Sequence, residues 1–206
     1  MGLSIWDGAP RTIQVEIDDW SNQSWGLHDV DRMTIRGEIA VSGNGSRMGK
    51  FDAEWFHYYL IRYSGRAYHT LYVLPIHSGY SIDDKNRIAY GGECACSWDA
   101  ERQKPDDSNC SQSAAIRLPG GKRVGSSRIA GALVVQYRHV NDKGTIRQLS
   151  LAPEHGCEVM EDLQRSKGTL GIPSALRRYR VTSYRPGEPD KSLFVLPAGY
   201  RVEAAH

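Results

Sequence analysis

Apolar and polar residues alternate in two segments near the start of the sequence. In residues 12–17 every second residue is isoleucine or valine, and residues 33–41 repeat this alternation over most of their length. Since successive side chains of a β-strand point to opposite faces, both segments predict strands with one buried face. The intervening residues 18–26 are rich in turn formers, so they predict a loop, which contains Trp20 and Trp25.

Three hairpins are predicted further along the chain, because aromatic and β-branched segments flank short runs of turn-forming residues. The first would lie at the centre of the sheet, since apolar residues occupy both faces of its two strands. The predicted strand pairs are residues 55–63 with 68–74, residues 132–140 with 145–151, and residues 179–184 with 193–196. Residues 87–98 predict one more strand, whereas the polar residues 99–113 predict a long exposed loop.

Residues 158–167 predict the single sizeable helix, because their apolar residues recur at helical spacing and Gly168 follows as a C-terminal cap. No linker or repeat divides the chain, and its 206 residues suit one β-rich domain. The sequence therefore predicts a mainly β fold over residues 1–206: an antiparallel β-sandwich with one short helix near residues 158–167.

The charges along the chain are nearly balanced. Lysine and arginine number 26 and aspartate and glutamate 24, which leaves a net charge of +2. Proteins that bind nucleic acid through its phosphates carry a clear basic excess, so we expect no nucleic-acid partner. No apolar run is long enough to span a bilayer, and the first residues lack the pattern of a signal peptide. We therefore expect no transmembrane segment, and a protein that is cytoplasmic or exported without a leader.

The cysteines are Cys94, Cys96, Cys110 and Cys157, which could in principle bind zinc. Structural zinc sites usually pair cysteines roughly two to four residues apart, and a single residue separates Cys94 from Cys96. We expect mostly buried free thiols, with a disulfide from Cys110 to Cys94 or Cys96 as the alternative. No metal ion and no cofactor is predicted.

His155 lies close to Cys157 in the sequence, and a cysteine nucleophile needs a base of this kind. Neighbours in sequence rarely have the geometry that catalysis requires, so we assign Cys157 to packing and predict no catalytic residue. A hydrolase or transferase that uses a Cys/His pair is an alternative function.

Aromatic rings in predicted loops are the candidate ligand-binding residues. Trp20, Trp25, His77 and Tyr80 lie at the ends of predicted strands rather than at alternating core positions. Exposed rings of this kind stack on sugars, cover choline through cation–π attraction or lie at the polar boundary of a bilayer. The alternative is that these rings pack beneath the loops as part of the core.

Two segments resemble a known toxin architecture. Residues 11–25 are similar to the opening strand and polar turn of the aegerolysin and actinoporin-like β-sandwiches, and residues 54–80 are similar to their later hairpin and its proline-containing loop. This resemblance implies recognition of a membrane lipid or sugar by loops at one end of a sandwich, with Pro75 and Tyr80 near the head-group pocket. It also implies a toxin-like role, although no amphipathic helix of the actinoporin kind precedes Arg11.

The leading prediction is a non-enzymatic protein that recognises a glycan or a membrane lipid head group. Its predicted ligand-binding residues are Trp20, Trp25, Pro75, His77 and Tyr80. Besides the Cys/His enzyme, a structural or assembly protein of a virion or crystal is an alternative, and a homo-oligomer is left open.

Overall fold

The computed structural model describes residues 9–22, 30–57, 62–73, 76, 78–93, 110–168 and 174–204. The strands are β1 (Arg11–Asn22), β2 (Val30–Val41), β3 (Arg47–His57), β4 (Arg62–Val73), β5 (Ser78–Asp83), β6 (Ile88–Glu93), β7 (Lys122–Ile129), β8 (Ala132–Val140), β9 (Ile146–Ala152), β10 (Glu158–Ser166), β11 (Ala175–Pro186) and β12 (Arg201–Glu203). The helical elements are α1 (Ser111–Arg117) and the 3-10 helices η3 (Pro153–His155) and η4 (Lys191–Phe194). The predicted mainly β fold is confirmed.

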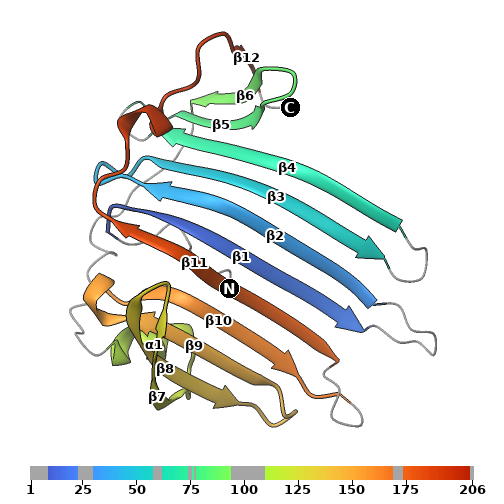
Figure 1. The fold of residues 1–206 in the computed structure, drawn as a ribbon, viewed down its shortest axis with the longest axis vertical. Helices are drawn as coiled ribbons and strands as arrows, with labels where there is room; N and C mark the ends of the chain where they lie inside the picture. The colour runs from blue at the N-terminus through green and yellow to red at the C-terminus, as the bar shows by residue number, and fades with distance from the viewer. Residues whose placement is uncertain are drawn as a thin grey trace.

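All the described strands belong to one 12-stranded sheet, in the order β12-β6-β5-β4-β3-β2-β1-β11-β10-β9-β8-β7. Figure 1 shows that β1 to β6 form one antiparallel meander and β7 to β11 form another. Antiparallel pairing of β1 with β11 joins the two meanders, and β12 returns to pair with β6 in parallel. Because the edge strands β12 and β7 do not pair with each other, the sheet is open.

The predicted β-sandwich is wrong, because the described strands form a single layer instead of two packed sheets. Alternating residues predict a strand with one buried face, but they do not show which element covers that face. In this protein α1 contributes to the core on one side of the sheet and η4 to the core on the other.

The predicted helix over residues 158–167 is also wrong, because β10 occupies this segment. A bulge between Val159 and Glu161 accompanies the burial of both Val159 and Met160, so the apolar residues lose the period of two that marks a strand. In the part of the chain that the structure describes, α1 is the only α-helix, and it begins within the segment where residues 99–113 predict a loop.

Several predicted strands are confirmed. Residues 12–17 and 33–41 lie in β1 and β2, β6 covers the first part of the strand predicted over 87–98, and β8 pairs with β9 as the second hairpin. β3 and β4 also pair, but residues 64–66 lie inside β4 rather than in the turn. The last hairpin is wrong, because residues 193–196 overlap η4.

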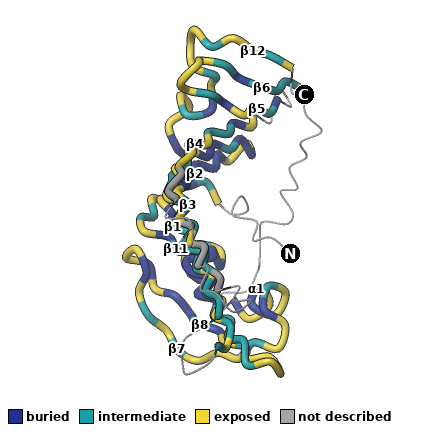
Figure 2. Tube along the Cα trace, turned by 90° about the vertical axis from the view of Figure 1, so that its right-hand side faces the viewer, coloured by how far each residue is buried: buried dark blue, intermediate teal, exposed yellow. Residues whose placement is uncertain are grey.

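The sheet is curved, and Figure 2 shows it in profile as an arc with α1 on the concave side. The larger core lies on this side, where Ala114 of α1 belongs to the same cluster as Ile13 and Ile39 of β1 and β2. Ala40 points to the opposite face of β2 and belongs to a smaller core that includes Phe194 of η4. The two faces of the sheet are therefore covered over different parts by the described elements.

Candidate functional site

The concave face of β1 to β3 carries apolar side chains that the larger core does not fully bury. The register aligns Ile17 with Ile35, and Ile35 with Ala53, across these three strands. Ile17 and Ile35 are half-buried, whereas Ala53 is buried. Charged residues alternate with them along the same strands, so the apolar positions face the concave side only.

Phe51 extends this apolar surface across Gly37, which has no side chain. The register places Phe51 opposite Gly37, and a Cβ atom at residue 37 would lie 2.5 Å from the ring atom Cδ1 of Phe51. Glycine at this position therefore leaves room for the phenyl ring to lie across β2. The ring is partly buried against the larger core, which holds it in place.

Trp55 of β3 and Tyr68 and Arg66 of β4 continue the surface to the next strand. The rings of Trp55 and Tyr68 meet edge to face with their centroids 6.4 Å apart. The guanidinium carbon of Arg66 lies 5.0 Å from the centroid of the Tyr68 ring, within reach of a cation–π interaction. The exposed fraction of Tyr68 is 36%. We call Ile17, Ile35, Phe51, Trp55 and Tyr68 the concave row.

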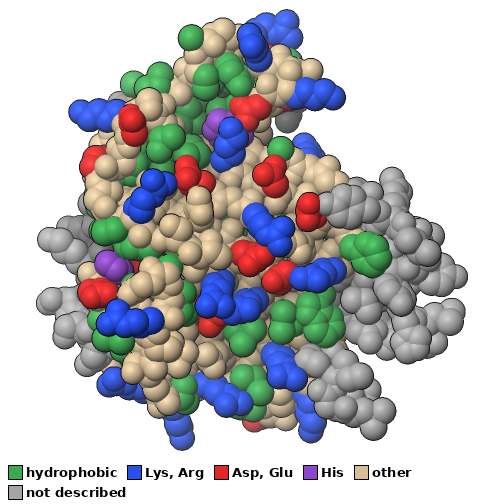
Figure 3. All heavy atoms as spheres, viewed as in Figure 1, with side chains coloured by type: hydrophobic (Ala, Val, Ile, Leu, Met, Phe, Trp, Pro, Cys, Tyr) green, Lys and Arg blue, Asp and Glu red, His purple; other side chains and the backbone are tan. Residues whose placement is uncertain are grey.

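Outside the smaller core, the convex face of the same strands is polar. Cross-strand ion pairs cover it, among them Arg32–Asp18 at 3.1 Å and Arg36–Glu16 at 3.0 Å. Figure 3 shows basic and acidic side chains interspersed over the middle of this face. Exposed pairs of this kind stabilise a fold by at most about 1 kcal/mol each, but they mark a surface that faces water.

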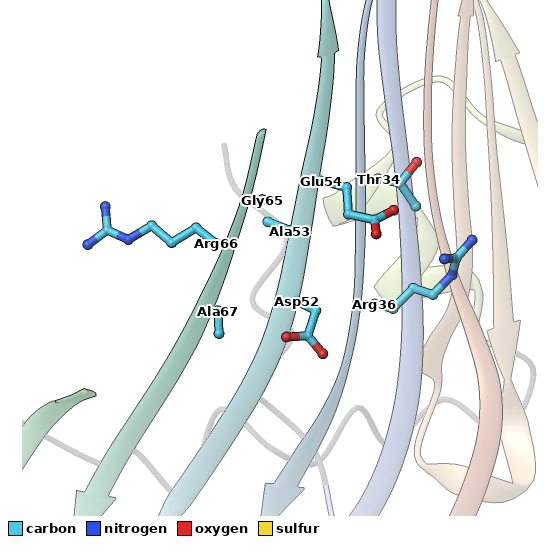
Figure 4. A pocket seen from close by; sticks show the side chains of 8 residues that line it. All are labelled: Thr34, Arg36, Asp52, Ala53, Glu54, Gly65, Arg66 and Ala67. Atoms are coloured by element: carbon cyan, nitrogen blue, oxygen red, sulfur yellow. The ribbon is translucent and has the colours of Figure 1, made fainter. Parts of the chain in front are cut away.

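Two open hollows lie on the convex side. One, of about 480 Å³, is bordered by the residues of β2, β3 and β4 that Figure 4 labels, although the side chain of Arg66 extends away from Asp52 and Glu54. The other, of about 510 Å³, shares residues of β2 and β3 with it and extends over β1. Arg36 and Asp52 line both hollows. Their walls are mostly charged or small residues, so neither hollow offers an enclosed apolar site.

A polar cluster on the convex side fastens the segment that follows η4. The Tyr200 hydroxyl donates to Oδ1 of Asp84 at 2.7 Å, Nδ1 of His69 lies 3.2 Å from Oδ2 of Asp84, and Nζ of Lys50 lies 3.5 Å from the same oxygen. Burial raises the pKa of Asp84, but the hydrogen bonds from Tyr200 and His69 outweigh burial and lower the pKa below its usual value. The Asp84 carboxylate therefore clamps the C-terminal segment to β4.

Arg11 and Glu158 form an ion pair inside the larger core. Nη2 of Arg11 donates to Oε1 of Glu158 at 3.0 Å, Nε lies 2.9 Å from Oε2, and the side chains are 0% and 5% exposed. Burial, followed by the Glu158 carboxylate, raises the pKa of Tyr184 to about 12 and also raises the pKa of Tyr179. The paired charges are a structural link between β1 and β10.

Cys110 and Cys157 form a disulfide, which links the start of α1 to the segment between η3 and β10. The prediction of free thiols is wrong for these two residues, and so is the alternative that Cys110 pairs with Cys94 or Cys96, both of which lie outside the described residues. His155 stacks on Tyr184 with ring centroids 4.2 Å apart. Since Cys157 has no free thiol, it cannot act as the nucleophile of a Cys/His enzyme.

The structure places two of the predicted ligand-binding residues inside strands. Trp20 lies near the end of β1 rather than in a loop, and Tyr80 lies in β5, half-buried against the smaller core. Strands β2, β3 and β4 separate them, so the structure does not bring them together. Trp25, Pro75 and His77 lie outside the described residues. A ligand-binding role for these five residues stays a prediction.

The concave row was missed at the level of the sequence, although part of its signal was present. Phe51, Ala53 and Trp55 alternate with Asp52 and Glu54, which is the period-two pattern of a strand with one apolar face. The row could not be recognised as a site, because its members come from four strands whose pairing the sequence does not show.

No protein-family model matches the sequence, and no curated protein is similar to it. Among solved structures, a chain of the Pseudomonas aeruginosa MucA/MucB complex is 15% identical with a TM-score of 0.42, and the match covers 92% of this chain but 56% of that one. LprF from Mycobacterium bovis is 9% identical with a TM-score of 0.39, and the match covers 88% of this chain and 89% of that one. A LolA superfamily protein from Nitrosomonas europaea is 7% identical with a TM-score of 0.35, with coverages of 91% and 90%.

The resemblance to aegerolysin and actinoporin-like β-sandwiches is wrong. The described strands form one curved, open sheet, whereas those families have two packed sheets. This chain spans just over half of the matched chain in the MucA/MucB complex. Within the described ranges, no helix is both long and apolar enough to cross a membrane.

Proposed function

We propose that this protein binds the acyl chain of a lipid, or of a lipid-modified molecule, on the concave face of its sheet without converting it chemically. The concave row is the observation that supports this function. It is an apolar and aromatic surface that the larger core leaves partly exposed, and the opposite face of the same strands is polar outside the smaller core. Apolar surface gains about 25 cal/mol for each Å² removed from water, so a hydrocarbon ligand would be stabilised there.

The dimensions of the row suit an extended chain. Neighbouring strands lie about 4.8 Å apart, so a path from β1 to β4 measures roughly 14 Å. Ile17 and Ile35 line its start on β1 and β2, Phe51 and Trp55 its middle on β3, and Tyr68 its end on β4. Sugar recognition needs several donors and acceptors around the rings. Within the row only Trp55 and Tyr68 carry a hydrogen-bonding group, and Arg66 adds donors, but no acceptor, at one end. We therefore favour an acyl chain over a glycan, and nothing in the row supports a toxin.

Binding is tested with a fluorescent palmitoyl probe and the purified protein. The wild-type protein should bind the probe saturably, and Tyr68→Ala should weaken binding several-fold, because aromatic residues carry a large share of the binding energy at such sites. Phe56→Ala is the matched control: Phe56 is 38% exposed, close to the 36% of Tyr68, but it lies on the opposite face of the sheet.

Circular dichroism should show that both variants remain folded. Equal loss of binding in the two variants would place the ligand elsewhere than on the concave face. A folded wild-type protein that binds no palmitoyl probe would refute the function itself.

A further inference from the structure

Arg66 is a cation at the end of the concave row, and among the described residues it pairs with no carboxylate. The register places Ala53 of β3 opposite Arg66. The two residues that flank Ala53, Asp52 and Glu54, are acidic, but strand alternation turns them to the convex side. Figure 4 shows Arg66 extending away from Asp52 and Glu54.

In contrast to Arg66, arginines on the convex face of a neighbouring strand form ion pairs with carboxylates. Arg32 and Arg36 of β2 each pair with a carboxylate of β1, at 3.1 Å and 3.0 Å. Among the described residues Arg66 makes no ion pair, and its contact is with the Tyr68 ring. Tyr68 therefore holds the guanidinium at the end of the apolar surface while its hydrogen-bond donors stay available.

The edge of β4 gives a ligand access to this cation. β5 pairs with residues 69–73 of β4, so in the described part of the chain Arg66 lies where β4 has no neighbour on that side. Arg66 and Tyr68 are exposed, in contrast to the other members of the row, which are half-buried. A ligand can thus place its hydrocarbon part on the row and its head at the sheet edge, beside the guanidinium.

We propose that the concave face selects amphiphiles with an anionic head group, carboxylate or phosphate, and that Arg66 pairs with this group. The proposal rests on the acyl-binding function above. A guanidinium forms two parallel hydrogen bonds with a carboxylate or phosphate, which a neutral head cannot match. The carboxylate would come from a free fatty acid and the phosphate from a phospholipid. Arg66 is a specificity-determining residue, and the apolar row supplies the affinity that all acyl ligands share.

Isothermal titration with three palmitoyl ligands tests this selection: palmitate, palmitoyl lysophosphatidate and the neutral palmitoylglycerol. The wild-type protein should bind at least one anionic ligand about fivefold more tightly than the neutral one, and added salt should reduce this preference. Arg66→Gln should abolish the preference and leave the affinity for palmitoylglycerol unchanged. Arg66→Lys should retain part of it, because the charge remains but the planar fork is lost.

Arg36→Gln is the control, since Arg36 is an exposed arginine on the convex face. It should leave the preference intact. Preference for palmitate alone or for lysophosphatidate alone supports the proposal and identifies the source of the head group. Equal binding of all three ligands by the wild-type protein, or an unchanged preference in Arg66→Gln, overturns the proposal while the acyl-binding function stands. Absence of binding by all three ligands overturns both.

Discussion

Removal of one partner of the Arg11–Glu158 pair should be the most costly single charge substitution described here. The pair makes two contacts of 3.0 Å and 2.9 Å between side chains that are 0% and 5% exposed. Arg11→Met would leave the Glu158 carboxylate buried without its partner, and breaking a buried pair in this way typically costs about 3–5 kcal/mol. The double variant Arg11→Met/Glu158→Leu removes both charges, so it should recover most of that loss.

Urea unfolding, followed by circular dichroism, measures these free energies of unfolding. The exposed pair provides the control: the side chains of Arg36 and Glu16 are 65% and 34% exposed, so Arg36→Met should cost less than about 1 kcal/mol. The reasoning fails if Arg11→Met costs no more than Arg36→Met, because the Arg11 charge would then be solvated. It also fails if the double variant is less stable than both single variants, because the loss would then come from packing rather than from an unpaired charge.

Three further predictions concern stability. The Cys110–Cys157 disulfide closes a separation of 47 residues, so the double change to alanine should lower the free energy of unfolding by about 4 kcal/mol in the loop-entropy model, and dithiothreitol should have no further effect on this variant. Burial raises the pKa of Tyr184 to about 12 from a usual value of 10. The contribution of the neutral Tyr184 to the free energy of unfolding is therefore fully present below pH 10 and lost as the pH rises through 12. The absorbance titration of the wild-type protein minus that of Tyr184→Phe measures this ionisation. Gly37→Ala should cost about 1–3 kcal/mol, since its Cβ would lie 2.2 Å from a carbonyl oxygen of β3, whereas Gly65→Ala, with a nearest contact of 3.6 Å, should be nearly neutral in the same urea assay.

The sequence predicted strand type best where one face of a strand is buried and the other is in water. β1 and β2 meet this condition over most of their length, and alternation found both. β10 does not, because its first five residues are all buried. Glu158, Glu161 and Asp162 are buried there as partners of arginines on other strands. A sequence pattern cannot show such partners, so the segment was misread as an amphipathic helix.

The candidate site was harder to predict than the strands that carry it. Gly65 between Ser64 and Arg66 predicts a turn. This prediction places Arg66 in the turn and Tyr68 in the following strand, so it does not put the two side chains on one face. In the structure β4 continues through these residues, so Arg66 and Tyr68 share a face. Trp20 was placed in a loop for the same reason, because turn-forming residues surround it, although β1 extends past it. Tertiary pairing decides both cases, and pairing is not visible in local turn chemistry.

The ladder between β1 and β11 also bears on how the chain reaches its fold. It pairs Arg11 with Pro186, whereas every other ladder within the two meanders joins strands that follow each other in sequence. Contacts between such distant residues form slowly, because the intervening chain must first be ordered. Pairing of β1 with β11 is therefore expected to limit the folding rate. Until these strands pair, β1 and β11 each present an unpaired edge in addition to the edges β12 and β7 of the native sheet, so the folding intermediate is expected to aggregate more readily than the native protein.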